Sequence, residues 1–159
     1  MAEFSKFLDS FDPETKGKQF EVFVKWFLKN DPEWSTQVDE VWLFDNWPKK
    51  WDRDKGTDLI FKHKNGEIWA VQAKCYNPDY NIKKEDINSF LADSHRPVIH
   101  KRLLIASTDL IGPNAKETLN GSGNVIKYLY SDFEKPAIDS PDHISKLSSA
   151  KRKKRPEPR

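Results

Sequence analysis

The segment spanning residues 56–74 most constrains the fold, because it holds two short apolar runs separated by Asn65-Gly66. Asn-Gly between two such runs is a strong β-hairpin signal. Asp58 precedes the first run, and Gln72 and Lys74 lie two residues apart at the end of the second. Residues two apart in a strand point to the same face. Burying an amide and an amine there is costly unless they are paired, and a divalent metal and a phosphate would be suitable partners.

The length of the turn decides whether Asp58 joins the other two side chains. A two-residue turn would place Asp58 opposite Ala73, on the face away from Gln72. A three-residue loop of residues 64–66, with Gly66 left-handed at a bulge, places Asp58 opposite Gln72. Only this register gathers the acid, the amide and the lysine on one face. We therefore predict the three-residue loop.

Asp58, thirteen residues and then Gln72-x-Lys74 resembles the PD-(D/E)xK nuclease signature, in the Mrr-type variant that uses Gln in place of an acidic residue. Residues 17–21, Gly-Lys-Gln-Phe-Glu, resemble the first-helix motif of the same family. Residues 41–48, 54–58 and 72–76 are similar to the N-terminal nuclease domain of single-polypeptide type ISP restriction-modification enzymes and related predicted helicases. The resemblance covers roughly residues 10–130.

This resemblance implies a fold and a set of site residues. The implied fold is an α/β restriction-endonuclease-like core, with a central mixed sheet flanked by helices. Mg²⁺, for which Mn²⁺ could substitute, would bind the Asp58 carboxylate, the Gln72 amide oxygen and the Ala73 carbonyl, since Mg²⁺ prefers oxygen ligands. Lys74 would orient the attacking water and offset phosphate charge, and Glu21 would reach toward the metal. Because Gln72 is neutral, a second tightly held ion is in doubt.

Hydrophobic periodicity predicts the other elements. Asp12 and Pro13 are expected to open a helix that runs to about Asn30. Residues 34–54, rich in Trp and Asp, are expected to form an irregular connector. The remaining expectations are a helix over 84–93, a buried strand over 102–107, a short helix over 114–119 and a last strand over 125–129. This order indicates an α/β layered domain.

Composition narrows the class of protein. The 159 residues suit one domain with a real core, and the single cysteine excludes a disulfide framework. The sequence has no apolar run of membrane-spanning length and no signal peptide, so we expect a cytoplasmic bacterial protein without a membrane partner. The nuclease domain is expected over 1–138, followed by a flexible basic linker over 139–159 toward a missing helicase/translocase and methyltransferase.

The net charge of +2 hides an uneven distribution. Residues 151–159 carry +5, which leaves residues 1–150 near −3. DNA must therefore be held by a local basic patch, and Lys83 and Lys84, which follow the signature, are candidates for phosphate contacts. The four histidines lack metal-ligand spacing, which argues against zinc. The alternative interpretation of Asp58 and Lys74 is a cross-strand salt bridge on an exposed sheet face.

Taken together, these features predict a Mg²⁺-dependent, type II-like endodeoxyribonuclease module that cuts double-stranded DNA. We expect it to belong to a larger ATP-dependent restriction-modification enzyme that acts in phage defence. Two alternatives remain open. One is a junction-resolving or repair nuclease with the same site, and the other is a catalytically inactive nuclease-like module that binds DNA.

Overall fold

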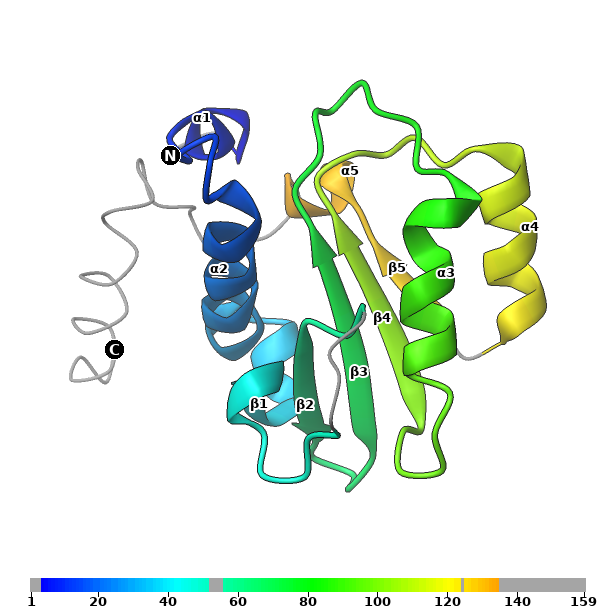
Figure 1. The fold of residues 1–159 in the computed structure, drawn as a ribbon. Coiled ribbons are helices and arrows are strands. Elements are labelled where there is room, and N and C mark those ends of the chain that lie inside the picture. Colours follow the sequence, from blue (N-terminus) through cyan, green and yellow to red (C-terminus); the bar gives the residue numbers. More distant parts are fainter. Residues whose placement is uncertain (1–3, 52–55, 124, 135–159) are drawn as a thin grey trace, which may run out of the picture.

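The computed structural model describes residues 4–51, 56–123 and 125–134, which form one layered α/β structure around a mixed five-stranded sheet (Figure 1). The strands are β1 (Val38–Leu43), β2 (Leu59–His63), β3 (Ile68–Lys74), β4 (Lys101–Ala106) and β5 (Val125–Tyr128). They lie side by side in chain order. Pairs β1–β2 and β2–β3 are antiparallel, whereas β3–β4 and β4–β5 are parallel. This arrangement confirms the predicted α/β fold with a mixed sheet.

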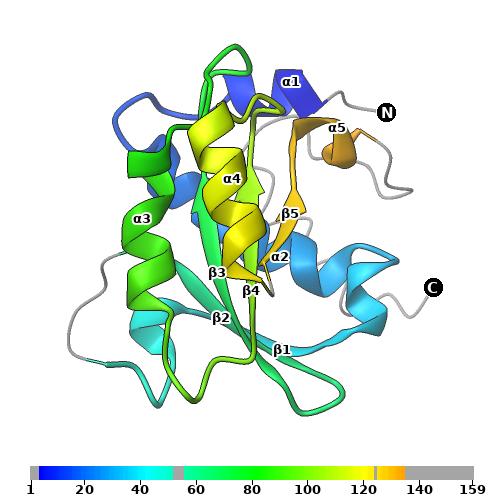
Figure 2. The ribbon, with the colours of Figure 1, turned by 90° about the vertical axis from the view of Figure 1, so that its right-hand side faces the viewer.

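Helices cover both faces of the sheet. Figures 1 and 2 show α2 (Lys16–Asn30) on one face, and α3 (Lys84–Asp93) and α4 (Pro113–Ser122) on the other. Two shorter helices, α1 (Phe4–Asp9) and α5 (Tyr130–Phe133), complete the α2 side, where Phe4 stacks on Phe133 with ring centroids 4.4 Å apart. Within the described ranges, no helix is long and apolar enough to cross a membrane.

The β2–β3 hairpin has the predicted register. Ile60 pairs with Ala70 and Lys62 with Ile68. The His63 N–H donates to the Glu67 carbonyl at 2.8 Å, which closes a three-residue loop. Gly66 in that loop has a φ of 95°, in the region that favours glycine. The predicted loop and its left-handed glycine are confirmed.

Strand alternation sorts the hairpin residues between two cores. Leu59, Phe61 and Val71 face α2 and pack among its aromatic side chains. Ile60 and Ala70 face the opposite way and pack against Phe90 of α3. Gln72 follows Ala70 by two residues, so it points to the α3 face of the sheet. The candidate site is therefore built between the hairpin and α3.

The expectation that residues 34–54 form an irregular connector is wrong for part of this segment, and its residues 52–54 lie outside the described residues. The segment contains β1, which is flanked by the short 3-10 helices η1 (Trp34–Thr36) and η2 (Phe44–Asn46). The register shifts between Val38 and Glu40 as β1 pairs with β2, so the buried residues Val38 and Val41 are three apart. A bulge of this kind breaks the period-two pattern by which a strand is found in sequence.

The first predicted helix starts later than expected. The Asp12 carboxylate accepts the Glu14 backbone N–H at 3.0 Å and so stabilises a turn, and the helix begins at Lys16. The predicted helix over 84–93 is confirmed, and the two later strands and the short helix are present with ends shifted by at most three residues. The predicted linker over 139–159 lies outside the described residues.

Candidate active site

Asp58 lies immediately before β2, where a hydrogen bond directs its side chain to the end of β3. Its Oδ2 accepts the Ala73 backbone N–H at 2.9 Å. The Asp58 backbone N–H donates to the Val71 carbonyl at 2.8 Å and continues the hairpin past the last strand pair. The carboxylate is thus held beside the Gln72-Ala73-Lys74 segment by the same strand pairing that the turn established.

Gln72 carries the most unusual polar group of the site. The residue is 1% exposed, and its Nε2 donates to the Asp86 carbonyl of α3 at 3.3 Å. Its Oε1 is buried and accepts no hydrogen bond from any residue that the structure describes. Leaving a buried acceptor unpaired costs about 1–3 kcal/mol. An amide oxygen is a ligand that Mg²⁺ accepts, so this oxygen fits a divalent cation.

A cavity of about 550 Å³ gathers the three signature residues. It is lined by Gly56, Asp58, Gln72, Lys74, Tyr76, Asp86 and Ser89. Lys74 ends β3, is partly exposed there and lines the cavity. Among the described residues, no group of three or more His, Cys, Asp or Glu is placed to hold a metal.

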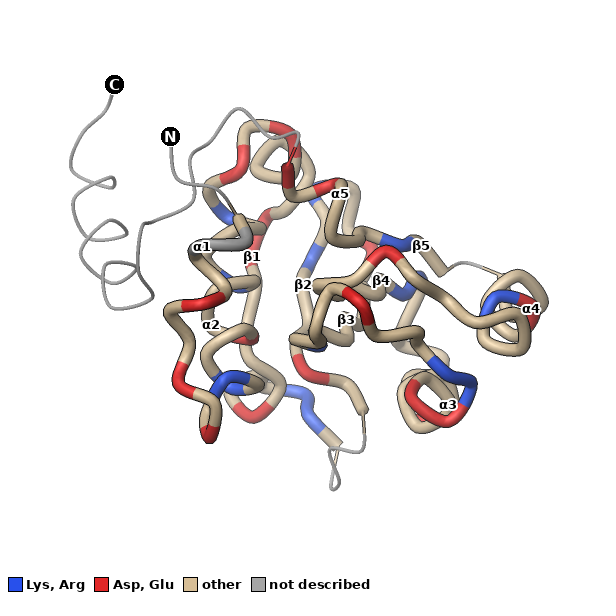
Figure 3. The backbone as a smooth tube through the Cα atoms, turned by 90° about the horizontal axis from the view of Figure 1, so that it is seen from above, with Lys and Arg blue, Asp and Glu red and all other residues tan. Residues whose placement is uncertain are grey.

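The remaining predicted residues are not among those that line the cavity. Glu21 is on α2, 3.3 Å from Lys18, with 18% of its side chain exposed. Ala73 is buried and contributes the N–H that Asp58 accepts. Lys83 and Lys84 are exposed at the start of α3, where acidic residues follow them directly. Figure 3, which looks onto the end of the sheet at which β3 finishes, shows basic and acidic segments interspersed there.

The cavity is also lined by residues of α3 and of the β3–α3 loop, which no pattern in the sequence had indicated as site residues. Asp86 accepts the Tyr80 hydroxyl at 2.6 Å and the Lys83 backbone N–H at 2.8 Å, both through Oδ2. Burial, followed by the negative charges of Asp86 and Asp58, raises the pKa of Tyr76, so its phenol stays protonated. The hydrogen bond to Asp86 raises the pKa of Tyr80 in the same direction.

Ser107 and Thr108 play a structural part beside the site. The Thr108 hydroxyl contacts the Pro78 and Tyr80 carbonyls at 2.9 and 2.8 Å, and the Ser107 hydroxyl donates to the Tyr76 carbonyl at 2.6 Å. Both residues are buried. They fix the loop that carries Tyr76 into the cavity.

Gly56 sets the distance between the segment before Asp58 and α3. A Cβ at this position would lie 2.6 Å from the Phe90 backbone nitrogen, and Gly56 has a φ of 142°.

We expect Gly56→Ala to push the segment off α3, to lower the free energy of unfolding by about 2–4 kcal/mol and to displace Asp58. Urea unfolding measures the change in the free energy of unfolding. Gly121→Ala is the control, because nothing lies within 4 Å of its Cβ position. Equal stability of the two variants would contradict the expectation.

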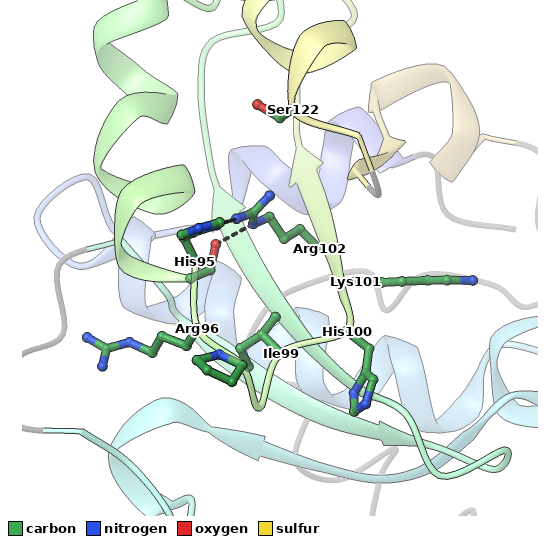
Figure 4. A pocket seen from close by; sticks show the side chains of 9 residues that line it. His95, Arg96, Ile99, His100, Lys101, Arg102 and Ser122 are labelled. Atoms are coloured by element: carbon green, nitrogen blue, oxygen red, sulfur yellow. Dashed lines mark hydrogen bonds between the residues drawn. The ribbon is translucent and has the colours of Figure 1, made fainter.

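A second cavity, of about 400 Å³, is rich in basic residues but is poorly suited to anion binding. It lies between the end of α3 and the start of β4 (Figure 4). The side chains of Arg96, His100 and Lys101 point away from one another. Arg102 donates to the Ser94 hydroxyl at 2.7 Å and to the Leu91 carbonyl at 3.3 Å, so its guanidinium holds the end of α3.

Comparison with known proteins identifies the family to which this chain belongs. Residues 29–150 match the model of the restriction endonuclease family Mrr_cat_2. The chain therefore belongs to this family of restriction endonucleases, which confirms the predicted resemblance. Comparison with curated protein sequences gave no significant match.

Two solved structures share the fold. One is the ATP-dependent type ISP restriction-modification enzyme LlaBIII bound to DNA, with a TM-score of 0.73 and 26% identity over 87% of this chain. The chain spans 9% of that protein. The other is the MspJI restriction endonuclease in complex with a 27-mer oligonucleotide, with a TM-score of 0.51 and 17% identity over 80% of this chain and 29% of that one. The likeness to MspJI shows the fold alone.

Proposed function

We propose that this chain is the Mg²⁺-dependent DNA-cutting module of a larger ATP-dependent restriction-modification enzyme. The observation that carries the proposal is the buried Oε1 of Gln72, which has no hydrogen-bond partner among the described residues and belongs to a side chain that lines a cavity with Asp58 and Lys74. If this face of the sheet served only for packing, an apolar side chain at position 72 would avoid the cost of burying an amide oxygen without a hydrogen bond. A divalent cation would satisfy it.

The residues that would hold Mg²⁺ are Asp58, Gln72 and the Ala73 carbonyl. When bound, the ion would supply an activated water and charge stabilisation at the phosphate. Asp58 contributes the negative charge, and Gln72 contributes an oxygen whose direction is set by the bond from its Nε2 to α3. The Lys74 ammonium donates hydrogen bonds, orients the attacking water and offsets charge on the scissile phosphate. We keep Glu21 as a supporting residue that reaches from α2.

The proposal that this chain is part of a larger enzyme is supported by the unequal coverage of the two chains in the type ISP match. Most of this chain aligns with a small part of that enzyme, so the likeness concerns one module of a much longer protein. We propose double-stranded DNA as the substrate, delivered by a translocase in the same polypeptide. The near-balanced charge of the chain supports delivery by another domain, because non-specific attraction to phosphates depends on excess positive charge. Lys83 and Lys84 are the proposed local phosphate contacts.

Nicking of supercoiled plasmid tests this proposal. The wild-type chain is expected to convert supercoiled to open-circular DNA in Mg²⁺ and to stop when EDTA is added. Lys74→Ala should slow nicking by about 10²–10³-fold, the usual effect of losing a group that positions or polarises the reactants, while DNA binding in a gel-shift assay stays within a few-fold.

Lys62→Ala is the matched control for that experiment. Lys62 is an exposed lysine of the same hairpin and does not line the cavity. It should nick plasmid at the wild-type rate. Nicking by Lys74→Ala at the rate of Lys62→Ala would refute the proposed role of Lys74. Nicking that persists in EDTA would refute the metal dependence.

A further inference from the structure

The proposed metal site is short of negative charge if only the signature residues form it. Asp58 is the one carboxylate of the signature, and Gln72 is neutral. Sites for divalent hard cations usually combine several oxygen ligands with one or two carboxylates. The cavity contains a second carboxylate, Asp86, which comes from the first turn of α3 rather than from the hairpin.

The hydrogen bonds of Asp86 leave one of its oxygens available. Oδ2 accepts both the Tyr80 hydroxyl and the Lys83 N–H, and no donor in the described part of the chain contacts Oδ1. These two bonds restrict rotation of the carboxylate, so the group is held in place at the cavity wall. After burial, the charges of Asp86 and Asp58 both raise the pKa of Tyr76, which agrees with the two carboxylates lying near that phenol.

The backbone of Asp86 orients the side chain of Gln72, the neutral ligand of the proposed site. Its carbonyl accepts Gln72 Nε2, so the amide group is turned with its nitrogen toward α3 and its oxygen away from that carbonyl. One residue therefore orients the neutral ligand through its main chain and brings a negative charge to the same cavity through its side chain. A role in capping α3 would explain why Asp86 accepts the Lys83 N–H. It would not explain why Asp86 lines the same cavity as Gln72, whose Oε1 has no hydrogen bond among the described residues.

We propose that Asp86 is the second acidic residue of the divalent-cation site and compensates for the neutral Gln72. This inference rests on the proposed function, because it assumes that Asp58 and Gln72 bind the ion. With Asp58, Asp86 and Lys74 the cavity carries a net charge of −1 from its lining residues. A divalent cation reverses that charge, and the cavity then attracts a phosphate instead of repelling it.

Mn²⁺ binding to the 159-residue chain in the absence of DNA tests the inference, by isothermal titration or by the electron paramagnetic resonance signal of free Mn²⁺. Asp86→Asn is expected to raise the Kd for Mn²⁺ about tenfold or more, the range found when supporting groups of a metal site are lost. The asparagine side chain keeps an oxygen that can accept the Lys83 and Tyr80 donors, so the start of α3 should remain folded. Circular dichroism checks this.

Glu85→Gln is the matched control. Glu85 is the neighbouring acid on α3, is exposed and does not line the cavity. The control removes the same charge and should leave the Kd within about twofold, because solvent screens an exposed charge. Equal Kd values for Asp86→Asn and Glu85→Gln would overturn the inference. Should Asp86→Asn fail to fold, Asp86→Ser, whose hydroxyl can accept the Lys83 N–H, is measured against the same control.

Asp58→Asn separates this inference from the proposed function. Loss of Mn²⁺ binding in Asp58→Asn, with wild-type binding in Asp86→Asn, would leave the proposed metal site standing and remove Asp86 from it. Wild-type binding in Asp58→Asn would overturn the proposed site itself, and absence of binding by the wild-type chain at millimolar Mn²⁺ would overturn both.

Discussion

Asp58→Asn is expected to slow plasmid nicking by about 10³-fold, which corresponds to roughly 4 kcal/mol of transition-state stabilisation. Asp58 is the only charged ligand of the signature, so its loss leaves the signature with two neutral oxygens. The asparagine oxygen can still accept the Ala73 N–H that Asp58 accepts at 2.9 Å. The hairpin should therefore stay intact while the charge is removed.

Single-turnover nicking at several Mg²⁺ concentrations, together with thermal melting of both proteins, measures this effect. A melting temperature within a few degrees of wild type would show that the fold survives. A folded Asp58→Asn variant that nicks DNA within tenfold of the wild-type rate would exclude Asp58 as the charged metal ligand. Restoration of the rate at high Mg²⁺ would instead show that the main effect is on metal affinity.

Phe23→Ala is expected to lower the free energy of unfolding by about 3–5 kcal/mol, as found for buried phenylalanines. Phe23 is 1% exposed, and its ring lies 4.7 Å from Phe7 and 5.8 Å from both Phe27 and Phe133, measured between centroids. It therefore joins α1, α2 and α5. The total stability of a domain is about 5–15 kcal/mol, so this single change removes a large share of it.

Urea unfolding followed by tryptophan fluorescence measures the loss. Val22→Ala is the control on the same helix, because Val22 is 40% exposed, and it should change stability by less than about 0.5–1 kcal/mol. Similar unfolding midpoints for the two variants would show that the aromatic core between α2 and the short helices is not a main source of stability.

The parts of the molecule that were predictable from sequence depend on short-range rules. The hairpin and its register follow from two short apolar runs and from a turn with glycine at its left-handed position. Once that register is known, Asp58 and Gln72 must lie opposite each other, and Lys74 must share their face. The helix over 84–93 follows in the same way from the apolar spacing of Ile87, Phe90 and Leu91.

The errors have an equally local origin. The bulge in β1 places Val38 and Val41 on one face at a spacing that no regular strand shows, so residues 34–54 were predicted to be irregular. Asp12 has a residue type that caps helices, but its carboxylate is used in a turn with Glu14. The helices α1 and α5 have six and four residues, which is too short for a periodic pattern to develop.

The sequence by itself therefore determined the class of fold and the pairing of Asp58 with Gln72-x-Lys74, because strand period and turn geometry act between residues near in the chain. Only the tertiary structure decided what surrounds them. Packing of α3 on the sheet brings Asp86 to the cavity, turns the Gln72 amide and leaves its Oε1 without a hydrogen bond among the described residues. These contacts join separate elements, and their geometry depends on how a helix docks on a sheet, which no spacing in the sequence encodes.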